Sequence, residues 1–536
     1  MACFEIKDGV GIIPEGTEVI GMWAFKNCTE LTSVVIPASV TNIGGGAFEG
    51  CTALTNVTIL GSVRYIDSDT FKGCVSLESV TIPDSVETIF RGAFEGCTAL
   101  TNITIPKSVI SIGASFRGCT SLASIVVAEG NKVYDSRENC NAIIKTESNQ
   151  LCVACKSTTI PENVTSIGDY AFHDCSSLTA ITIPDSVIEI RFGAFQGCTG
   201  LTNIAIPDSV TVIRDGAFRN CTGLTTITIP DSVTEIGRFV FKGCTALTAI
   251  AIPDSVTRIE EFTFSGCTAL TNVAVPDSVT MIDEHAFDYC SSLTAITIPD
   301  SVTVVRNAAF RGCTGLTAIT IPDSVTVISC GTFAGCRGLT SVVIPEGVTE
   351  IDDNAFQGCT GLTSVFLPET VQLIKSEAFE GCRGLTSIVI PESVTEIGWY
   401  AFKECTSLKS INIPQSVKNV GLKAFENCTA LTDITLSEGV TAIEKGGFSG
   451  CSSLKEIVFP AGFTRIDTRA FDDCTALETV TLPTGVKNIK EAPFEGCTAL
   501  KTINVPAKKT DYYKQRLPEE LHALIVEQAP VKKAKK

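Results

Sequence analysis

The chain has few of the residues on which catalytic sites usually depend. Its 536 residues include only three histidines, three methionines and two tryptophans. His173, His285 and His522 are too scattered to predict a Ser-His-Asp or Cys-His arrangement, and neither a P-loop nor a His-Glu-x-x-His motif occurs. We therefore do not expect an enzyme, and the sequence predicts no cofactor and no catalytic residue.

Long apolar runs and a basic surface are also missing. No stretch reaches the about 18 apolar residues that suggest a transmembrane helix. No apolar core of a secretory leader follows Met1, so taken literally the sequence predicts a protein that stays in the cytoplasm. A net charge of −18 argues against a nucleic-acid partner, because neutralising phosphates requires a basic face.

Cysteine, in contrast, is abundant and regularly spaced. Of the 25 cysteines, five run from Cys28 to Cys119 in steps of 23, 23, 23 and 22 residues, and 15 run from Cys175 to Cys497 in steps of 23. Each of these has a phenylalanine three residues before it. A fixed period of this length indicates a stack of near-identical units instead of one globular core.

One repeat, residues 178–200, reads LTAITIPDSVIEIRFGAFQGCTG. The alternation around Ile181 and Ile183 predicts a strand with one buried face, and Pro184 ends it because proline has no N–H to donate. A turn and a second extended stretch follow. Phe195 and Cys198 are spaced by three, which predicts a helical or 3-10 turn, and Gly197 is suited to left-handed backbone at its end.

Such small units bury their apolar residues only by stacking in register. Phenylalanine and cysteine are then expected to form structural ladders, with members Phe195, Cys198, Phe218, Cys221, Phe241 and Cys244. Disulfides along the ladder are not expected, because parallel neighbours keep their Cβ atoms about 4.8 Å apart.

The motif LTAITIPDSVIEI…AFQGCTG resembles the BspA-type leucine-rich repeat, and the resemblance covers residues 10–506. It implies a solenoid of about 22 repeats with a parallel sheet on its concave face. It also implies adhesion or protein recognition at a cell surface, with a protein or glycan ligand. This location conflicts with the missing leader, so the compartment stays open. An intracellular protein-interaction scaffold is the alternative, and a monomer is expected.

The repeats divide the chain into five segments. Residues 1–12 are expected to form an N-terminal edge strand or cap, and repeats fill 13–127 and 160–506. Between them, 128–159 predicts a β-hairpin around Glu147-Ser148 that projects from the solenoid, either as a splice or as a docking element. Residues 507–536 predict a C-terminal capping helix near Leu517, with partner binding as the alternative, and then a basic disordered tip.

Two groups of residues are candidate sites. The first is an acidic stripe, one aspartate directly after the proline of seven successive repeats. It either binds calcium or a cationic partner, or it is a row of solvated turn residues. Its members are Asp185, Asp208, Asp231, Asp254, Asp277, Asp300 and Asp323. A turn at Glu147-Ser148 would place Cys140 directly across from Cys155, a possible disulfide in an oxidising environment. The outward strand positions are small and neutral, with Phe366 as an isolated exception.

Overall fold

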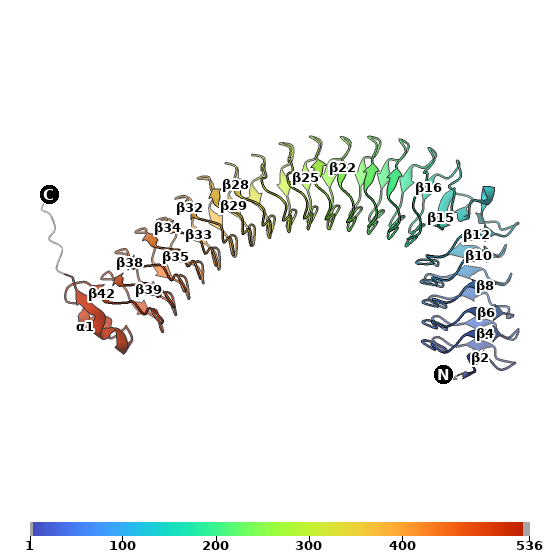
Figure 1. Ribbon diagram of the computed structural model, residues 1–536, viewed down its shortest axis with the longest axis horizontal. Coiled ribbons are helices and arrows are strands. Elements are labelled where there is room, and N and C mark those ends of the chain that lie inside the picture. Colours follow the sequence, from blue (N-terminus) through green and yellow to red (C-terminus); the bar gives the residue numbers. More distant parts are fainter. Residues whose placement is uncertain (1–3, 529–536) are drawn as a thin grey trace. The chain divides into compact units, whose positions relative to one another are not determined.

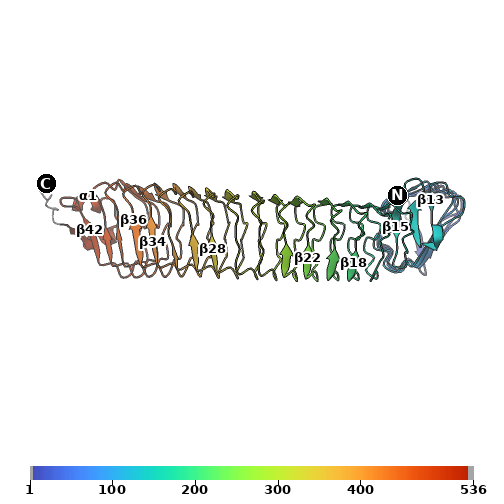
Figure 2. The ribbon, with the colours of Figure 1, turned by 90° about the horizontal axis from the view of Figure 1, so that it is seen from above.

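Each 23-residue repeat forms one turn of a β-solenoid with two short parallel strands and very little helix. The computed structural model describes residues 4–528. Contacts divide the chain into two units, residues 1–256 with 260–270 and residues 257–259 with 271–536. Figure 1 labels the elements, and Figure 2 shows the turns as successive rungs.

In a typical turn, β18 (Asn203–Ala205) is followed by a Pro-Asp-Ser turn and β19 (Val212–Ile213). Strands of successive repeats pair in parallel with a shift of one repeat, as Asn203 pairs with Thr226. The alternating residues of β18 point to opposite faces, so Ile204 is buried while Asn203 and Ala205 are exposed.

In the first unit, the first strands of the repeats are β2 (Val10–Ile12), β4 (Ser33–Ile36), β6 (Asn56–Ile59), β8 (Ser79–Val80), β10 (Asn102–Ile105), β12 (Ser124–Val127), β18, β20 (Thr226–Thr228) and β22 (Ala249–Ala251). The second strands are β3 (Val19–Ile20), β5 (Asn42–Ile43), β7 (Tyr65–Ile66), β9 (Thr88–Ile89), β11 (Ser111–Ile112), β16 (Ser166–Ile167), β17 (Glu189–Ile190), β19 and β21 (Glu235–Ile236).

In the second unit, the first strands are β24 (Asn272–Ala274), β28 (Ser341–Val343), β30 (Ser364–Phe366), β32 (Ser387–Ile388), β34 (Ser410–Ile413), β36 (Asp433–Leu436), β38 (Glu456–Val458), β40 (Thr479–Thr481) and β42 (Thr502–Val505). The second strands are β23 (Arg258–Ile259), β25 (Met281–Ile282), β26 (Val304–Val305), β27 (Val327–Ile328), β29 (Glu350–Ile351), β31 (Leu373–Ile374), β33 (Glu396–Ile397), β35 (Asn419–Val420), β37 (Ala442–Ile443), β39 (Arg465–Ile466) and β41 (Asn488–Ile489).

The segment that carries phenylalanine and cysteine is a series of tight turns and not a helix. The amide of Cys198 donates to Phe195 O at 3.1 Å, within the turn, whereas the amide of Phe195 donates to Ala217 O of the next repeat at 2.8 Å. Gly197 has a φ of +75°, the left-handed conformation that the sequence predicts there. The bond from Cys198 to Phe195 spans three residues, as in a 3-10 turn, so the predicted helical or 3-10 turn takes the form of single tight turns joined by inter-repeat bonds.

The ladder phenylalanines and cysteines form the core of each unit. Neighbouring rings stack with centroids 4.9–5.8 Å apart, among them Phe195, Phe218 and Phe241. Most of the ladder cysteines are buried beside them, and the Sγ of Cys221 donates to Phe195 O of the preceding repeat at 3.1 Å. The same bond recurs at Cys198 and Cys244, so the thiol joins successive turns.

The serine after the acidic residue forms a further ladder. Its hydroxyl donates to a valine carbonyl of the preceding repeat, as from Ser186 to Val164 at 2.6 Å and from Ser209 to Val187 at 2.7 Å. The Pro-Asp-Ser turn is therefore fixed by its serine, while the preceding aspartate stays in solvent.

The insertion continues the sheet of second strands and does not project, so that part of the prediction is wrong. Its elements are β13 (Tyr134–Asp135), η1 (Arg137–Asn139), β14 (Ala142–Lys145) and β15 (Gln150–Ala154). β14 pairs antiparallel with β13 and β15, and β15 pairs in parallel with β16. Ile143 and Ile144 are fully buried, which makes the hairpin part of the core.

Both described ends of the chain are covered. At the start, β1 (Glu5–Lys7) pairs antiparallel with β2, and Phe4 stacks on Phe25 at 5.3 Å. At the end, α1 (Thr510–Lys514) and the 3-10 helix η2 (Glu519–Leu524) lead to β43 (Ile525–Glu527), which pairs with β42.

The helix predicted from Leu517 is therefore only a short 3-10 helix, because its last residues join the sheet. The predicted basic tip lies outside the described residues.

Candidate binding surfaces

Each of the three histidines has a contact of its own within its unit. The Nδ1 of His173 is 3.1 Å from Asp174, and that of His285 is 3.2 Å from Asp288, whose carboxylate also binds Arg311. The Nε2 of His522 is 3.1 Å from Leu517 O. Within residues 4–528 no group of three or more His, Cys, Asp or Glu is arranged to hold a metal ion.

The ladder thiols are poorly suited to chemistry. Burial raises the pKa of Cys267 to about 12 and raises the pKa of Cys198, Cys221 and Cys244 well above the ordinary value. A thiol that stays protonated is a weak nucleophile and a weak metal ligand.

Cys140 and Cys155 are both buried and both carry free thiols. Ala142 pairs with Ala154, and a register shift follows between Ile143 and Ile144, so the predicted alignment of the two cysteines is off by one residue. The Sγ of Cys155 instead donates to Asn141 O at 3.4 Å. A disulfide between them stays a prediction, and this register does not favour it.

The acidic stripe lies in exposed turns, one residue in each repeat; its members are Asp185, Asp208, Asp231 and Asp254 in the first unit and Asp277, Asp300 and Asp323 in the second. The adjacent serine supplies the turn's inter-repeat bond, so the carboxylates are not needed for it. Calcium binding by this stripe stays a prediction.

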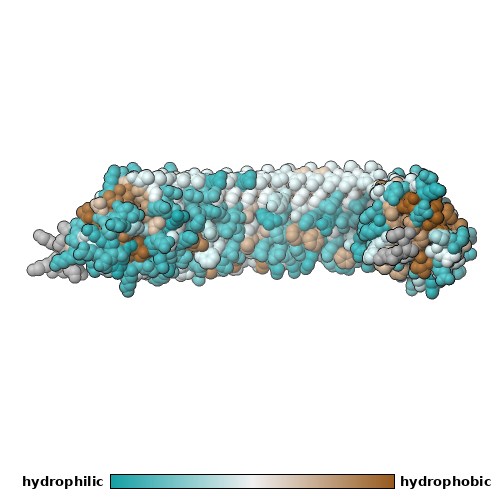
Figure 3. Space-filling view, turned by 90° about the horizontal axis from the view of Figure 1, so that it is seen from below, coloured by the Kyte–Doolittle hydropathy of each residue, from teal (hydrophilic) through white to brown (hydrophobic). Residues whose placement is uncertain are grey.

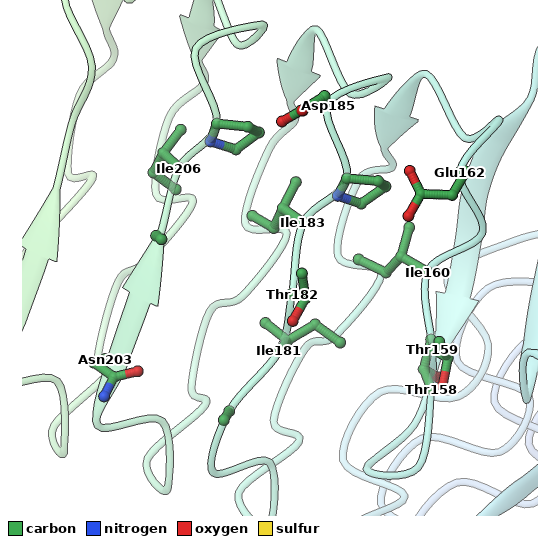
Figure 4. Close-up of a pocket in the computed structure, with 14 residues that line it drawn as sticks. Thr158, Thr159, Ile160, Glu162, Ile181, Thr182, Ile183, Asp185, Asn203 and Ile206 are labelled. Atoms are coloured by element: carbon green, nitrogen blue, oxygen red, sulfur yellow. The ribbon is translucent and has the colours of Figure 1, made fainter.

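An open groove of about 840 Å³ crosses the strand face of the first unit next to the insertion (Figure 4). Its lining combines isoleucines with small polar residues such as Thr182 and Asn203, while Glu162 and Asp185 lie at one end. The neighbouring first strands are interrupted here, because β12 pairs with β10 and β18 with β20. Backbone amide and carbonyl groups are therefore available at the floor of the groove.

The strand face of the second unit carries an apolar patch formed by Val343, Phe366 and Val389. Their exposed fractions are 67%, 57% and 79%, and Val343 pairs directly with Phe366. They hold one outward position in three successive repeats, where Thr320 precedes and Asn412 follows. Phe366 is therefore not an isolated exception. The sequence already indicated the patch, because large apolar residues replace small or polar ones at this position in three successive repeats.

Other large apolar side chains are also exposed, and brown areas are visible among pale and hydrophilic ones in Figure 3; Val343, Phe366 and Val389 differ in holding the same position in three successive repeats. The buried partners of the patch, Val342, Val365 and Ile388, already supply the core contacts of these strands. The fold does not need Val343, Phe366 and Val389 to be apolar, which makes the patch a candidate contact for a partner.

These turns, ladders and surfaces define a leucine-rich repeat solenoid. The sequence model of the BspA type leucine rich repeat region matches residues 18–144, 142–250, 190–317, 234–363, 305–430, 349–478 and 397–517. The chain therefore belongs to the BspA-type leucine-rich repeat family, whose members are repeat proteins that typically bind other proteins. No helix among the described residues is long and apolar enough to cross a membrane.

Two solved structures are similar to this chain. A leucine-rich repeat protein from Bacteroides ovatus is 28% identical, covers 74% of this chain and 98% of its own, and has a TM-score of 0.52. A leucine rich cell surface protein from Faecalibacterium prausnitzii is 31% identical over 69% of this chain and 93% of its own, with a TM-score of 0.36. No curated protein matches the chain.

Proposed function

We propose that this chain is a non-enzymatic recognition solenoid that binds a protein partner through the patch of Val343, Phe366 and Val389. The exposure of the three side chains carries the proposal, because burying an exposed side chain of this kind is worth about 1.5–3 kcal/mol. An apolar centre with a polar rim is the usual plan of a protein interface. Exposed Ser364, at the start of β30, and exposed Glu369, three residues after its end, supply part of such a rim.

The partner contact is tested with a photo-crosslinking amino acid at position 366 of the full chain, expressed in its own cells. A discrete crosslinked protein is expected, and it should disappear when Val343→Thr and Val389→Thr are added. Val458 is the matched control, since it holds the same outward position in β38 and is 54% exposed. Equal crosslinking from 366 and 458, or none from 366, would contradict the proposal.

We further propose that the partner is met at a cell surface in adhesion, as the family resemblance implies. The alternative is an intracellular scaffold, which the high content of 25 cysteines motivates. Protease added to intact cells separates the two: a surface protein is degraded, whereas protection of the chain would favour the scaffold. Adhesion itself is tested by comparing attachment of cells with the wild-type chain and the Phe366→Thr variant.

A further inference from the structure

A second cavity lies in the first unit where the insertion meets the regular repeats. It has a volume of about 350 Å³. Arg91 and Arg117 reach it from the repeats before the insertion, Cys152 comes from β15, and Asp169 and Tyr170 follow β16. The cavity therefore exists only because the insertion brings these segments together.

Arg117 has no carboxylate partner among the described residues. Its guanidinium carbon is 3.7 Å from the centre of the Tyr170 ring, and its Nε is buried without a hydrogen-bond partner. Glu95 holds the position of Arg117 in the preceding repeat. Its carboxylate already binds Lys72 at 2.9 Å. The Tyr170 ring thus supports the guanidinium by a cation–π contact, and the N–H groups of Arg117, which bind no carboxylate among residues 4–528, are left for a ligand.

The other charges around the cavity leave a net positive balance. Asp169 is the one carboxylate in the lining, and it is held by Arg191 through Nε at 3.1 Å and through a terminal nitrogen at 3.5 Å. Arg91 is exposed and makes no described side-chain hydrogen bond or ion pair. The charge around the cavity is therefore positive, although the net charge of the whole chain is −18.

We infer that this cavity binds an oxyanion, a carboxylate or phosphate group of a small ligand. Arg117 presents a planar fork that matches two oxygens of such a group, and Arg91 adds a second positive charge. Gln150, also in the lining, offers a neutral amide donor. The volume is at the lower end of the roughly 300–1,000 Å³ typical of small-molecule sites. The inference does not depend on the proposed protein partner, which concerns the second unit.

The unpartnered Nε does not define the site alone, because Arg219 has one too. Arg219 follows the repeat phenylalanine Phe218 as Arg117 follows Phe116, but it lies in a regular repeat and outside the cavity. The combination of a second arginine, an aromatic support and a cavity is what distinguishes Arg117. Arg219 is therefore a matched control for it.

The test is isothermal titration of the full chain at low ionic strength with two probes, inorganic phosphate and succinate. Saturable 1:1 binding of at least one probe is expected, and the preferred probe identifies the oxyanion. Arg117→Gln and Arg91→Gln should each weaken it by about tenfold or more, while Arg219→Gln leaves it unchanged. Arg117→Lys should also weaken binding, because lysine keeps the charge and loses the fork.

Absence of saturable binding for both probes would overturn the inference. So would an equal loss of affinity in Arg219→Gln, which would indicate a general effect of positive charge. Full affinity in Arg117→Lys would refute the role of the fork. Circular dichroism establishes that the variants are folded, and the exposed Arg91 provides a substitution that does not disturb the core.

Discussion

At the scale of single residues, the ladder cysteine is a hydrogen-bond donor as well as a buried apolar side chain. Phe195 O accepts both the amide of Cys198 and the Sγ of Cys221, each at 3.1 Å. A carbonyl has two lone pairs, and both are used here in the core. Valine or alanine at position 221 would leave this second acceptor site empty, which gives a physical reason for cysteine in each repeat.

Cys221→Val tests this role, because valine is apolar and similar in size but cannot donate. We expect the free energy of unfolding to fall by about 1 kcal/mol, the usual value of one buried hydrogen bond. Urea unfolding followed by circular dichroism measures it. Cys330, which lies off the ladder and is only partly buried, is the control, and Cys330→Val should change stability by no more than a few tenths. Equal stabilities of the two variants would show that the thiol bond contributes nothing.

The same burial makes stability depend on pH. The folded-state pKa of Cys267 is raised to about 12, so its contribution is fully present below the ordinary value of 9.0 and is lost as pH rises toward 12. Replacing Cys221, Cys244 and Cys267 together by alanine should therefore make the decline in unfolding free energy between pH 9 and 12 shallower. The difference is at most about 4 kcal/mol per pH unit. Urea titrations across this range measure it, and identical slopes would contradict the prediction.

At the scale of elements, the C-terminal segment supplies hydrogen-bond donors to backbone carbonyls of the last repeat. These donors come from side chains, because no further repeat follows to supply them. The hydroxyl of Tyr512 donates to Val486 O at 2.7 Å, which is the position that the serine hydroxyl fills between ordinary repeats. The hydroxyl of Tyr513 donates to Pro483 O, and its side chain is fully buried. Two tyrosines thus end the stack.

Tyr513→Phe removes one of these bonds and keeps the ring. We expect the free energy of unfolding to fall by about 1–2 kcal/mol, since the partly buried Pro483 carbonyl loses its donor. Faster amide hydrogen exchange in β42 and β43 should accompany the loss, because the C-terminal segment that contains Tyr513 also contributes β43, which pairs with β42. Tyr289→Phe is the control, as Tyr289 is 55% exposed and lies in a regular repeat. Unchanged exchange in Tyr513→Phe would show that the cap does not protect the last repeats.

Elements that depend on one repeat alone were predictable, and those that depend on neighbours were not. Pro184 marks the end of a strand, and Phe195 and Cys198 mark the core, by spacing alone. The bond from Ser186 to Val164 becomes visible only when turns are stacked. The register shift beside Ile143 is equally hidden, because one extra residue in a hairpin leaves no periodic signal.

Among the candidate sites, too, one was predictable from the sequence and the other was not. The three apolar residues of the patch are readable in the sequence once their common repeat position is known, so Val343 and Val389 could have been grouped with Phe366. The cavity of Arg91 and Arg117 was not predictable, because Tyr170 is distant in the sequence and only the insertion brings it close.

At the scale of the whole molecule, the parallel register means that each turn meets only its neighbours within a unit. β17 pairs with β19, and β19 pairs with β21, always with a shift of one repeat. Contacts of this kind make stability a sum over repeats and their interfaces. The chain should then tolerate changes in length that preserve the register.

Deletion of residues 201–223 removes one whole repeat of the first unit and tests this additivity. The ring of Phe195 should then stack on Phe241, and β17 should pair with β21, because the sequence after residue 223 repeats that after residue 200. We expect a far-ultraviolet circular dichroism spectrum of unchanged shape and a urea midpoint close to that of the full chain. Deletion of residues 201–211, about half a repeat, is the control; it displaces the ladder residues from register and should destabilise the unit severely. If both deletions are tolerated equally, register is not what holds the turns together; if neither folds, the repeats are not interchangeable units.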